Sequence, residues 1–283
     1  MIGGNNASTT YSGTISGSGG LRKQGTGTLT LTGSNTFWGG TTVEAGTLLV
    51  GEHFALAPPG YFVTQFVVAA SGTLDMARHA QAFLNSRVDG TVINSTGLAS
   101  FYTIGLTGTG VLGGPAYVTG THSPGSTHPG VQTFNNLSYD GDSIVNWKLF
   151  ANSTSLPGVN YDQIVLPTGN LLFLEDSTRF RFNFAGSVDW SDAFWDSSHN
   201  WTVIHVVTGS TFGFESSGID RGWSPIDSMG QRLSPSRGAF SLVQVGQDVV
   251  LQFTAVPEPS TCAVALAGLA CGGYSMVRRR RRA

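Results

Sequence analysis

The sequence predicts an all-β protein with a β-solenoid body and one C-terminal transmembrane helix. Gly, Ser and Thr make up about a third of the 283 residues, and Gly and Thr are poor helix formers. A short word that begins with Gly recurs about every 20 residues in the first third of the chain. Near the C-terminus, residues 261–277 form an apolar run without a charge. Because 40% of the residues are hydrophobic and only 11% are charged, a highly charged disordered chain is excluded.

The recurring word places the first strands. It reads GTLTL from Gly27, GTLLV from Gly46, GTLDM from Gly72 and GTVIN from Gly90. In the first three copies an apolar residue stands two and four places after the Gly, and the fourth copy keeps the first of these. This constant phase predicts one strand per solenoid turn with the same face inward. A β-sandwich is the alternative, but its strands recur at about 8–12 residues, so the longer period favours the solenoid.

The rest of the body carries shorter signals. Residues 76–85 fit either a helical turn or an irregular coil, and the sequence DGD at 140–142 predicts a hairpin turn. Alternating apolar runs predict strands at 143–149, 161–166, 179–184, 201–207 and 248–254. The stretch rich in Pro, Gly and Ser near 113–130 is the strongest break. We therefore divide the chain into a solenoid at 1–112, a continued solenoid or β-rich body at 113–255, and a tail at 256–283.

Charge and cysteine usage exclude several kinds of site. Five of the 15 basic residues are the arginines at 278–282, which leaves ten basic against 17 acidic residues elsewhere, a difference of −7. An acidic body lacks the surface that phosphates need, so we expect no nucleic-acid partner. Both cysteines, Cys262 and Cys271, lie in the tail, so the body has neither a disulfide nor a thiolate metal site.

The tail predicts a membrane span. At about 1.5 Å per residue, residues 261–277 reach about 25 Å as a helix, the short end of a membrane span. A cluster of positive charges next to a span marks its cytoplasmic side. The alternative is a buried helix with a solvated basic end. The membrane-stop residues are Arg278, Arg279, Arg280, Arg281 and Arg282.

Pro257, Glu258 and Pro259, followed by the apolar run and the terminal arginines, resemble the PEP-CTERM sorting signal of exported bacterial proteins. The resemblance implies that these three residues are a sorting motif and the substrate of an exosortase-type processing enzyme. It also implies that the inner membrane holds the precursor transiently through residues 261–277. Residues 1–20 lack the positive and apolar regions of a secretory signal peptide. We therefore expect Met1 to be a misplaced start or the chain to be a fragment; the rival explanation is an unused tail.

Residues 9–51 resemble a second family. The segment that begins at Ser12 is similar to the autotransporter-associated β-strand repeat of secreted passenger domains, and it reads SGTISGSGGLRKQGTGTLTLTGSNTFWGGTTVEAGTLLVG. Trp38 departs from the pattern, because the family has a small residue after the aromatic one. The resemblance implies a right-handed parallel β-helix and a secreted setting, and it implies no reaction.

One cluster is a candidate binding site. Asp189, Trp190, Asp192, Trp195 and Asp196 bring three carboxylates and two indole rings together. Carboxylates bind Ca²⁺ and rings stack on sugars, so we expect a glycan or calcium contact. The spacing does not match known calcium loops, and an exposed loop anchored by its aromatic residues is the alternative.

No motif indicates catalysis. The chain has no HExxH pair and no GxSxG elbow, so we expect no metal site, no cofactor and no catalytic residue. The sequence thus predicts an exported surface or extracellular-matrix protein with a structural or adhesive role and exopolysaccharide as a partner. Two alternatives remain open, a carbohydrate-binding surface module and a β-helical polysaccharide-degrading enzyme.

Overall fold

The computed structural model describes residues 1–52, 55–56, 63–174, 178–221 and 223–257, and these are built from strands. Nineteen strands form one sheet, and β2 and β5 form a separate pair. Two short 3-10 helices, η1 and η2, interrupt the strands in the second half of the chain. The all-β class predicted from the composition is therefore observed.

The first strands are β1 (Thr9–Tyr11), β2 (Ser16–Gly17), β3 (Leu21–Lys23), β4 (Thr28–Leu31), β5 (Thr36–Phe37), β6 (Thr41–Val50), β7 (Val63–Asp75), β8 (Gln81–Val88), β9 (Thr91–Ile93), β10 (Phe101–Gly108) and β11 (Val111–Pro124). The later elements are β12 (Val131–Tyr139), β13 (Ile144–Leu149), β14 (Gln163–Leu166), β15 (Leu171–Phe173), β16 (Arg179–Phe184), η1 (Ala193–Asp196), β17 (His199–Val206), β18 (Thr211–Phe212), η2 (Phe214–Ser216), β19 (Gly218–Ile219), β20 (Gly238–Val245) and β21 (Asp248–Ala255).

The four copies of the recurring word pair with one another in parallel. Leu29 is the register partner of Leu48, Leu48 of Leu74, and Leu74 of Val92. All four side chains are buried, as the phase of the word predicts. We call the chain between one such strand and its next partner a coil. Each coil therefore buries its apolar face in a shared core and bonds its backbone to the next coil.

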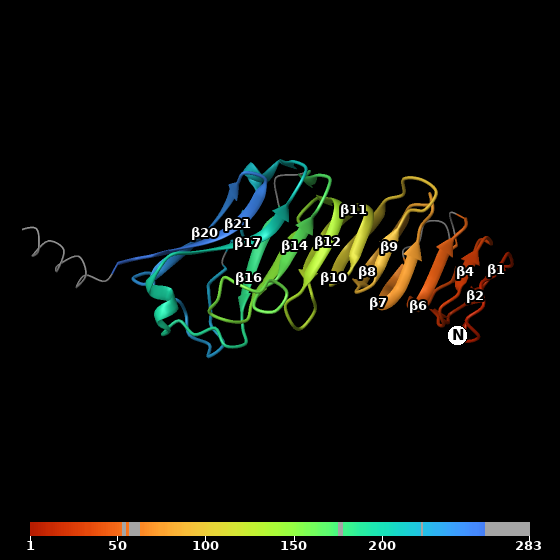
Figure 1. Ribbon diagram of the computed structural model, residues 1–283, viewed down its shortest axis with the longest axis horizontal. Coiled ribbons are helices and arrows are strands. Elements are labelled where there is room, and N and C mark those ends of the chain that lie inside the picture. The colour runs from red at the N-terminus through yellow and green to blue at the C-terminus, as the bar shows by residue number, and fades with distance from the viewer. Residues whose placement is uncertain (53–54, 57–62, 175–177, 222, 258–283) are drawn as a thin grey trace, which may run out of the picture.

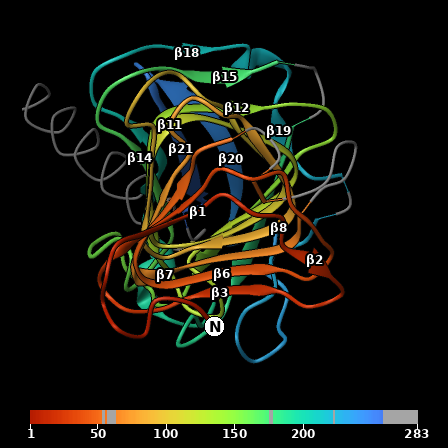
Figure 2. The same ribbon diagram turned by 90° about the vertical axis from the view of Figure 1, so that its right-hand side faces the viewer.

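The coils of the second half of the chain are longer than those of the first half. Thr9 pairs with Leu29, 20 residues on, whereas Ile144 pairs with Arg179, 35 residues on. In the views along and across the long axis, the coils form an elongated stack (Figures 1 and 2). The far end of the stack is not parallel, because β21 pairs antiparallel with both β17 and β20.

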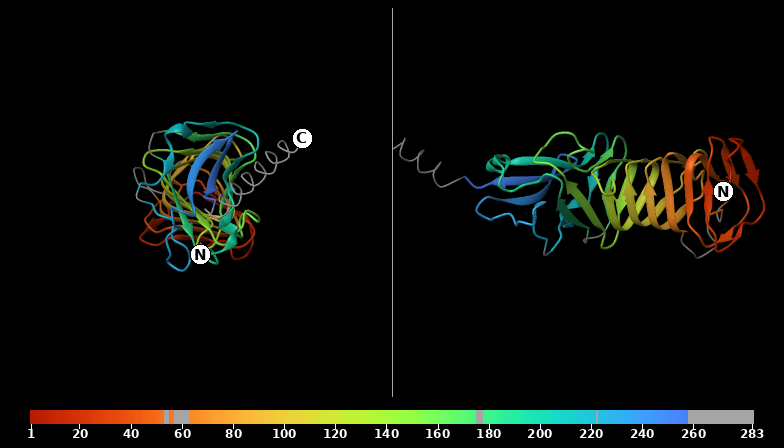
Figure 3. Two further views of the ribbon diagram at one scale, coloured as in Figure 1. Left: turned by 90° about the vertical axis from the view of Figure 1, so that its left-hand side faces the viewer. Right: turned by 90° about the horizontal axis from the view of Figure 1, so that it is seen from below.

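The predicted fold class, a right-handed parallel β-helix with one C-terminal transmembrane helix, is wrong as stated. Among the residues that the structure describes, no helix is long and apolar enough to cross a membrane. The predicted span at 261–277 lies outside them. The antiparallel hairpin of β20 and β21 also ends the parallel stacking within the body, at the end away from β1 (Figure 3).

The core changes character along the stack. In the first half it consists of aliphatic side chains and a column of phenylalanines, in which the Phe66 and Phe83 rings stack at 4.3 Å. In the second half bulky aromatic residues fill it. The buried tryptophans of the described chain are Trp147, Trp190, Trp195 and Trp201. The buried tryptophans thus lie where the coils are longest.

Several local predictions can be compared directly. The strands expected at 143–149, 161–166, 179–184, 201–207 and 248–254 are present as β13, β14, β16, β17 and β21. The expected helical turn or irregular coil at 76–85 is wrong in its second half, which is the start of β8. A turn forms at 140–142, but it joins strands that do not pair with each other, so it is not a hairpin. The boundary placed at 112/113 falls inside β11, and the division into domains stays a prediction.

Candidate functional site

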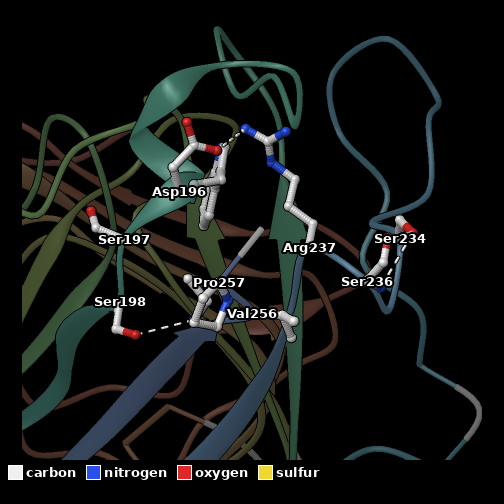
Figure 4. A pocket seen from close by; sticks show the side chains of 10 residues that line it. Asp196, Ser197, Ser198, Ser234, Ser236, Arg237, Val256 and Pro257 are labelled. Atoms are coloured by element: carbon white, nitrogen blue, oxygen red, sulfur yellow. Dashed lines mark hydrogen bonds and ion pairs between the residues drawn. The ribbon is translucent and has the colours of Figure 1, made fainter. Parts of the chain in front are cut away.

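A groove lies at the last described residues, and it is the candidate functional site (Figure 4). Its volume is about 800 Å³. It joins two regions that the sequence singled out separately, the aspartate–tryptophan cluster and the start of the sorting motif. The lining residues are Trp195, Asp196, Ser197, Ser198, Ser234, Ser236, Arg237, Ala255, Val256 and Pro257.

The short helix η1 forms one wall. Asp192 caps its N-terminus, because the carboxylate Oδ1 accepts a hydrogen bond of 2.7 Å from the backbone N–H of Phe194. The turn directs Trp195 into the core, where its ring packs edge-on against Trp190 at 4.6 Å and Phe253 at 5.0 Å. Asp196, the next residue, points to solvent. A single turn of chain therefore anchors the wall and exposes one carboxylate.

Arg237 bridges the two sides of the groove. Its Nη2 donates to the carbonyl oxygen of Asp192 at 2.7 Å and to Oδ1 of Asp196 at 2.8 Å. The carbonyl oxygen of Arg237 accepts a 3.0 Å hydrogen bond from the N–H of Val256, and Ser198 Oγ accepts one of 3.1 Å from the N–H of Ala255. Ala255 and Val256, near the end of the described residues, are thus held from both sides.

The predicted glycan or calcium residues are engaged within the protein. Asp189 Oδ1 accepts hydrogen bonds from the N–H and the hydroxyl of Ser191, and these bonds lower the pKa of its carboxyl. Trp190 and Trp195 are 5% and 0% exposed, so neither ring offers a face for a sugar. No group of three metal-ligating side chains occurs in the described part of the chain. Both rings are anchored in the core, and the predicted glycan or calcium contact of this cluster stays a prediction.

The sorting motif is only partly visible. Pro257 lies at the rim of the groove, as the close view shows (Figure 4). Glu258, Pro259 and the arginines at 278–282 lie outside the described residues. Their predicted roles therefore stay predictions.

A serine and a histidine meet beside the groove without forming an activated nucleophile. Ser197 Oγ lies 3.2 Å from Nε2 of His199. The same nitrogen also lies against the carbonyl oxygen of Phe194, which can only accept a hydrogen bond. Nε2 therefore carries the proton and donates, so it cannot take a proton from Ser197.

A buried polar network in the core was missed by the sequence analysis. His122 is fully buried, with Nδ1 2.6 Å from the Tyr139 hydroxyl and Nε2 2.8 Å from Oε1 of Gln132. Because the Gln132 oxygen accepts, Nε2 donates, and Nδ1 accepts from Tyr139. Burial lowers the pKa of His122 to about 4, and the charge of Lys148 acts in the same direction. The imidazole is therefore neutral at pH 7.

An ion pair lies in the same part of the core. Lys148 Nζ is 2.8 Å from Oδ2 of Asp162 and donates to the carbonyl oxygen of Pro124 at 2.6 Å. The N–H of Gly130 donates to Oδ1 of Asp162 at 2.8 Å. Burial raises the pKa of Asp162 to about 6, against the opposing effect of Lys148 and the backbone N–H groups. Every polar atom of the pair thus has a partner, as a structural role requires.

Residues 21–50 match the Passenger-associated-transport-repeat family. The match lies within the region for which we noted the resemblance and spans β3 to β6. A 125-residue segment is also 36% identical to the adhesin BmaC autotransporter of Brucella suis biovar 1 (strain 1330). That alignment covers 44% of this chain and 3% of the relative, so the chain spans a small part of the relative's length.

Proposed function

We propose that the protein is an exported cell-surface protein with an adhesive or structural role and no catalytic activity. The observation that carries the proposal is the passenger-associated repeat at residues 21–50, whose strands β3 and β4 both pair in parallel with β6 in the next coil. The relative that shares 36% identity over 125 residues is named as an adhesin, which supports the adhesive role.

The physical character of the stack supports the same role. Along the described part of the chain, backbone hydrogen bonds join each coil to its neighbours, so the ladder itself maintains the length of the stack. Only 11% of the residues are charged, and the outer surface is rich in Ser and Thr. An elongated and weakly charged body suits a spacer or contact surface at the cell exterior.

Processing at the C-terminus is the finer part of the proposal. Pro257 stands at the rim of the groove, and Arg237 and Ser198 hold the two residues before it. A peptide bond after this point would be presented to an exosortase-type enzyme next to a rigid body. Exopolysaccharide is the proposed matrix partner.

Two measurements on native cells test this function. Protease treatment of intact cells should remove the protein, and deletion of its gene should lower attachment of the cells to a surface or matrix. Retention of the protein inside intact cells would refute the surface assignment. The mass of the C-terminal peptide tests processing separately: an end near residues 257–260 supports it, and survival of Arg282 and Ala283 contradicts it.

A further inference from the structure

A second, shallow groove crosses strands β7, β8, β10 and β11, far along the chain from the C-terminal groove. Its volume is about 460 Å³. Its floor is one ladder of register partners, in which Gln65 pairs with Asn85, Asn85 with Gly105, and Gly105 with Thr121. Because Gly105 has no side chain, the surface of the groove is lowest at this position. A Cβ atom on residue 105 would lie 2.8 Å from Oδ1 of Asn85.

The groove offers hydrogen-bonding groups without net charge. Gln65, Asn85 and Thr121 are exposed, and their amides and hydroxyl both donate and accept. Arg87 is the one charged lining residue, and its Nε bonds to Oδ2 of Asp89 at 2.6 Å. A ligand that fits this lining carries many hydroxyls and no charge.

A pair of tyrosines stands on the same strands. Tyr102 of β10 and Tyr117 of β11 are register partners, and their rings stack at 4.8 Å with an interplanar angle of 19°. The next positions in this ladder are Ala82 on one side and Ser138 on the other, both small. The outer ring faces therefore have no large neighbour in the ladder, and Tyr102 is 41% exposed. Tyr102 lies three positions before Gly105 on β10, about 10 Å along an extended chain, and the register with β11 shifts between Thr103 and Gly105.

We propose that the groove and the tyrosine pair together bind a polysaccharide of neutral sugars. Apolar ring faces beside uncharged amides and hydroxyls match the two sides of a sugar ring, its C–H faces and its hydroxyl edges. An acidic polysaccharide would meet an acidic body and an arginine that is already paired. The inference rests on the proposed adhesive function and names its ligand class. It also moves the sugar contact away from the buried Trp190 and Trp195.

Affinity electrophoresis of the full chain tests the proposal. Dextran and galactomannan serve as neutral probes in the gel, and polygalacturonate serves as the acidic probe. We expect at least one neutral probe to slow the protein and polygalacturonate not to do so. The variants Tyr102→Ala and Asn85→Ala should each weaken that binding, about tenfold for the loss of one stacked ring. Tyr11→Ala is the matched control, because Tyr11 is 44% exposed on a distant coil.

These outcomes test the polysaccharide ligand separately from the proposed adhesive function. Absence of retardation by both neutral probes, or equal retardation by polygalacturonate, overturns the inference. Equal loss of binding in Tyr11→Ala also overturns it. Thr121→Val removes a hydroxyl at constant shape, so weakened binding with unchanged thermal unfolding supports a direct contact. If the groove variants bind the neutral probe as strongly as the wild type does, the inference fails, and continued attachment of the cells would show that the proposed adhesive function still stands.

Discussion

Acidification from pH 7 to pH 5 should lower the free energy of unfolding through His122 by about 2 kcal/mol. The folded-state pKa of this residue is lowered to about 4, whereas an unfolded histidine titrates near 6.5. Between about pH 4 and pH 6.5 the histidine of the unfolded chain binds a proton, whereas the buried imidazole of the folded protein does not. The contribution of His122 is therefore complete above about pH 6.5 and is lost as the pH falls towards 4.

Urea unfolding at pH 7 and pH 5 measures this effect, with His122→Gln as the test variant and His128→Gln as the control. His128 lies on an exposed turn near the same coil. The raised pKa of Asp162 acts in the opposite direction, since the folded protein takes up that proton first, and it contributes to all three proteins. The wild type and His128→Gln should lose about 2 kcal/mol more than His122→Gln between the two pH values. Equal losses in all three proteins would refute the reasoning.

Three further substitutions test the interior ion pair, the inward column and a coil corner, with Asp196→Asn as the exposed control for the first. Asp162→Asn leaves the Lys148 ammonium buried without its carboxylate and should lower the free energy of unfolding by about 3–5 kcal/mol, measured by urea unfolding. Asp196→Asn removes one partner of an exposed ion pair and should lower it by about 1 kcal/mol or less in the same assay. Leu74→Ala opens a cavity in the middle of the inward column and should cost about 2–5 kcal/mol in the same assay. Gly46→Ala should cost at least about 1 kcal/mol, because its φ is +63° and a Cβ would lie 2.5 Å from two backbone oxygens of the preceding coil, measured as a lower thermal midpoint.

Matched variants separate the causes. Gly141 has a similar φ of +60° but open space around it, so Gly141→Ala should cost less than Gly46→Ala. Val111→Ala at a 40% exposed position should cost less than Leu74→Ala. If Gly141→Ala lowers stability as much as Gly46→Ala, close backbone contact is not the cause of the loss at Gly46. If Val111→Ala lowers stability as much as Leu74→Ala, burial is not the cause of the loss at Leu74.

The sequence predicts the first coils well because the same word repeats in them. The Gly–Thr pair of β6 is the register partner of the Gly–Thr pair of β7, so identical letters in the sequence lie side by side in space. A fixed phase also determines which side chains point inward, and Leu29, Leu48 and Leu74 are buried accordingly.

The second half is harder to predict because alternation identifies a strand but not its partner. The run at 248–254 predicts a strand, yet nothing local shows that it pairs antiparallel with β17 and β20. The sequence around Trp190 and Trp195 fits exposed and buried rings equally well, because distant residues complete their packing. Trp190 Nε1 donates to the carbonyl oxygen of Gln231, and the Trp195 ring packs against Phe253. His122, Lys148 and Asp162 carry no sequence signal, because polar residues are usually at the surface and their partners lie 10 to 24 residues away.

The change from aliphatic to aromatic core along the stack has a mechanical consequence. A buried indole or phenyl ring removes about 150–250 Å² from water, more than the leucines of the first coils. Under a pulling force the molecule should therefore peel from the β1 end, one coil at a time. Each released coil of about 20 residues would add about 70 Å of contour length to a force–extension trace. The tryptophan-rich end would unfold last and would stay folded while the earlier coils extend.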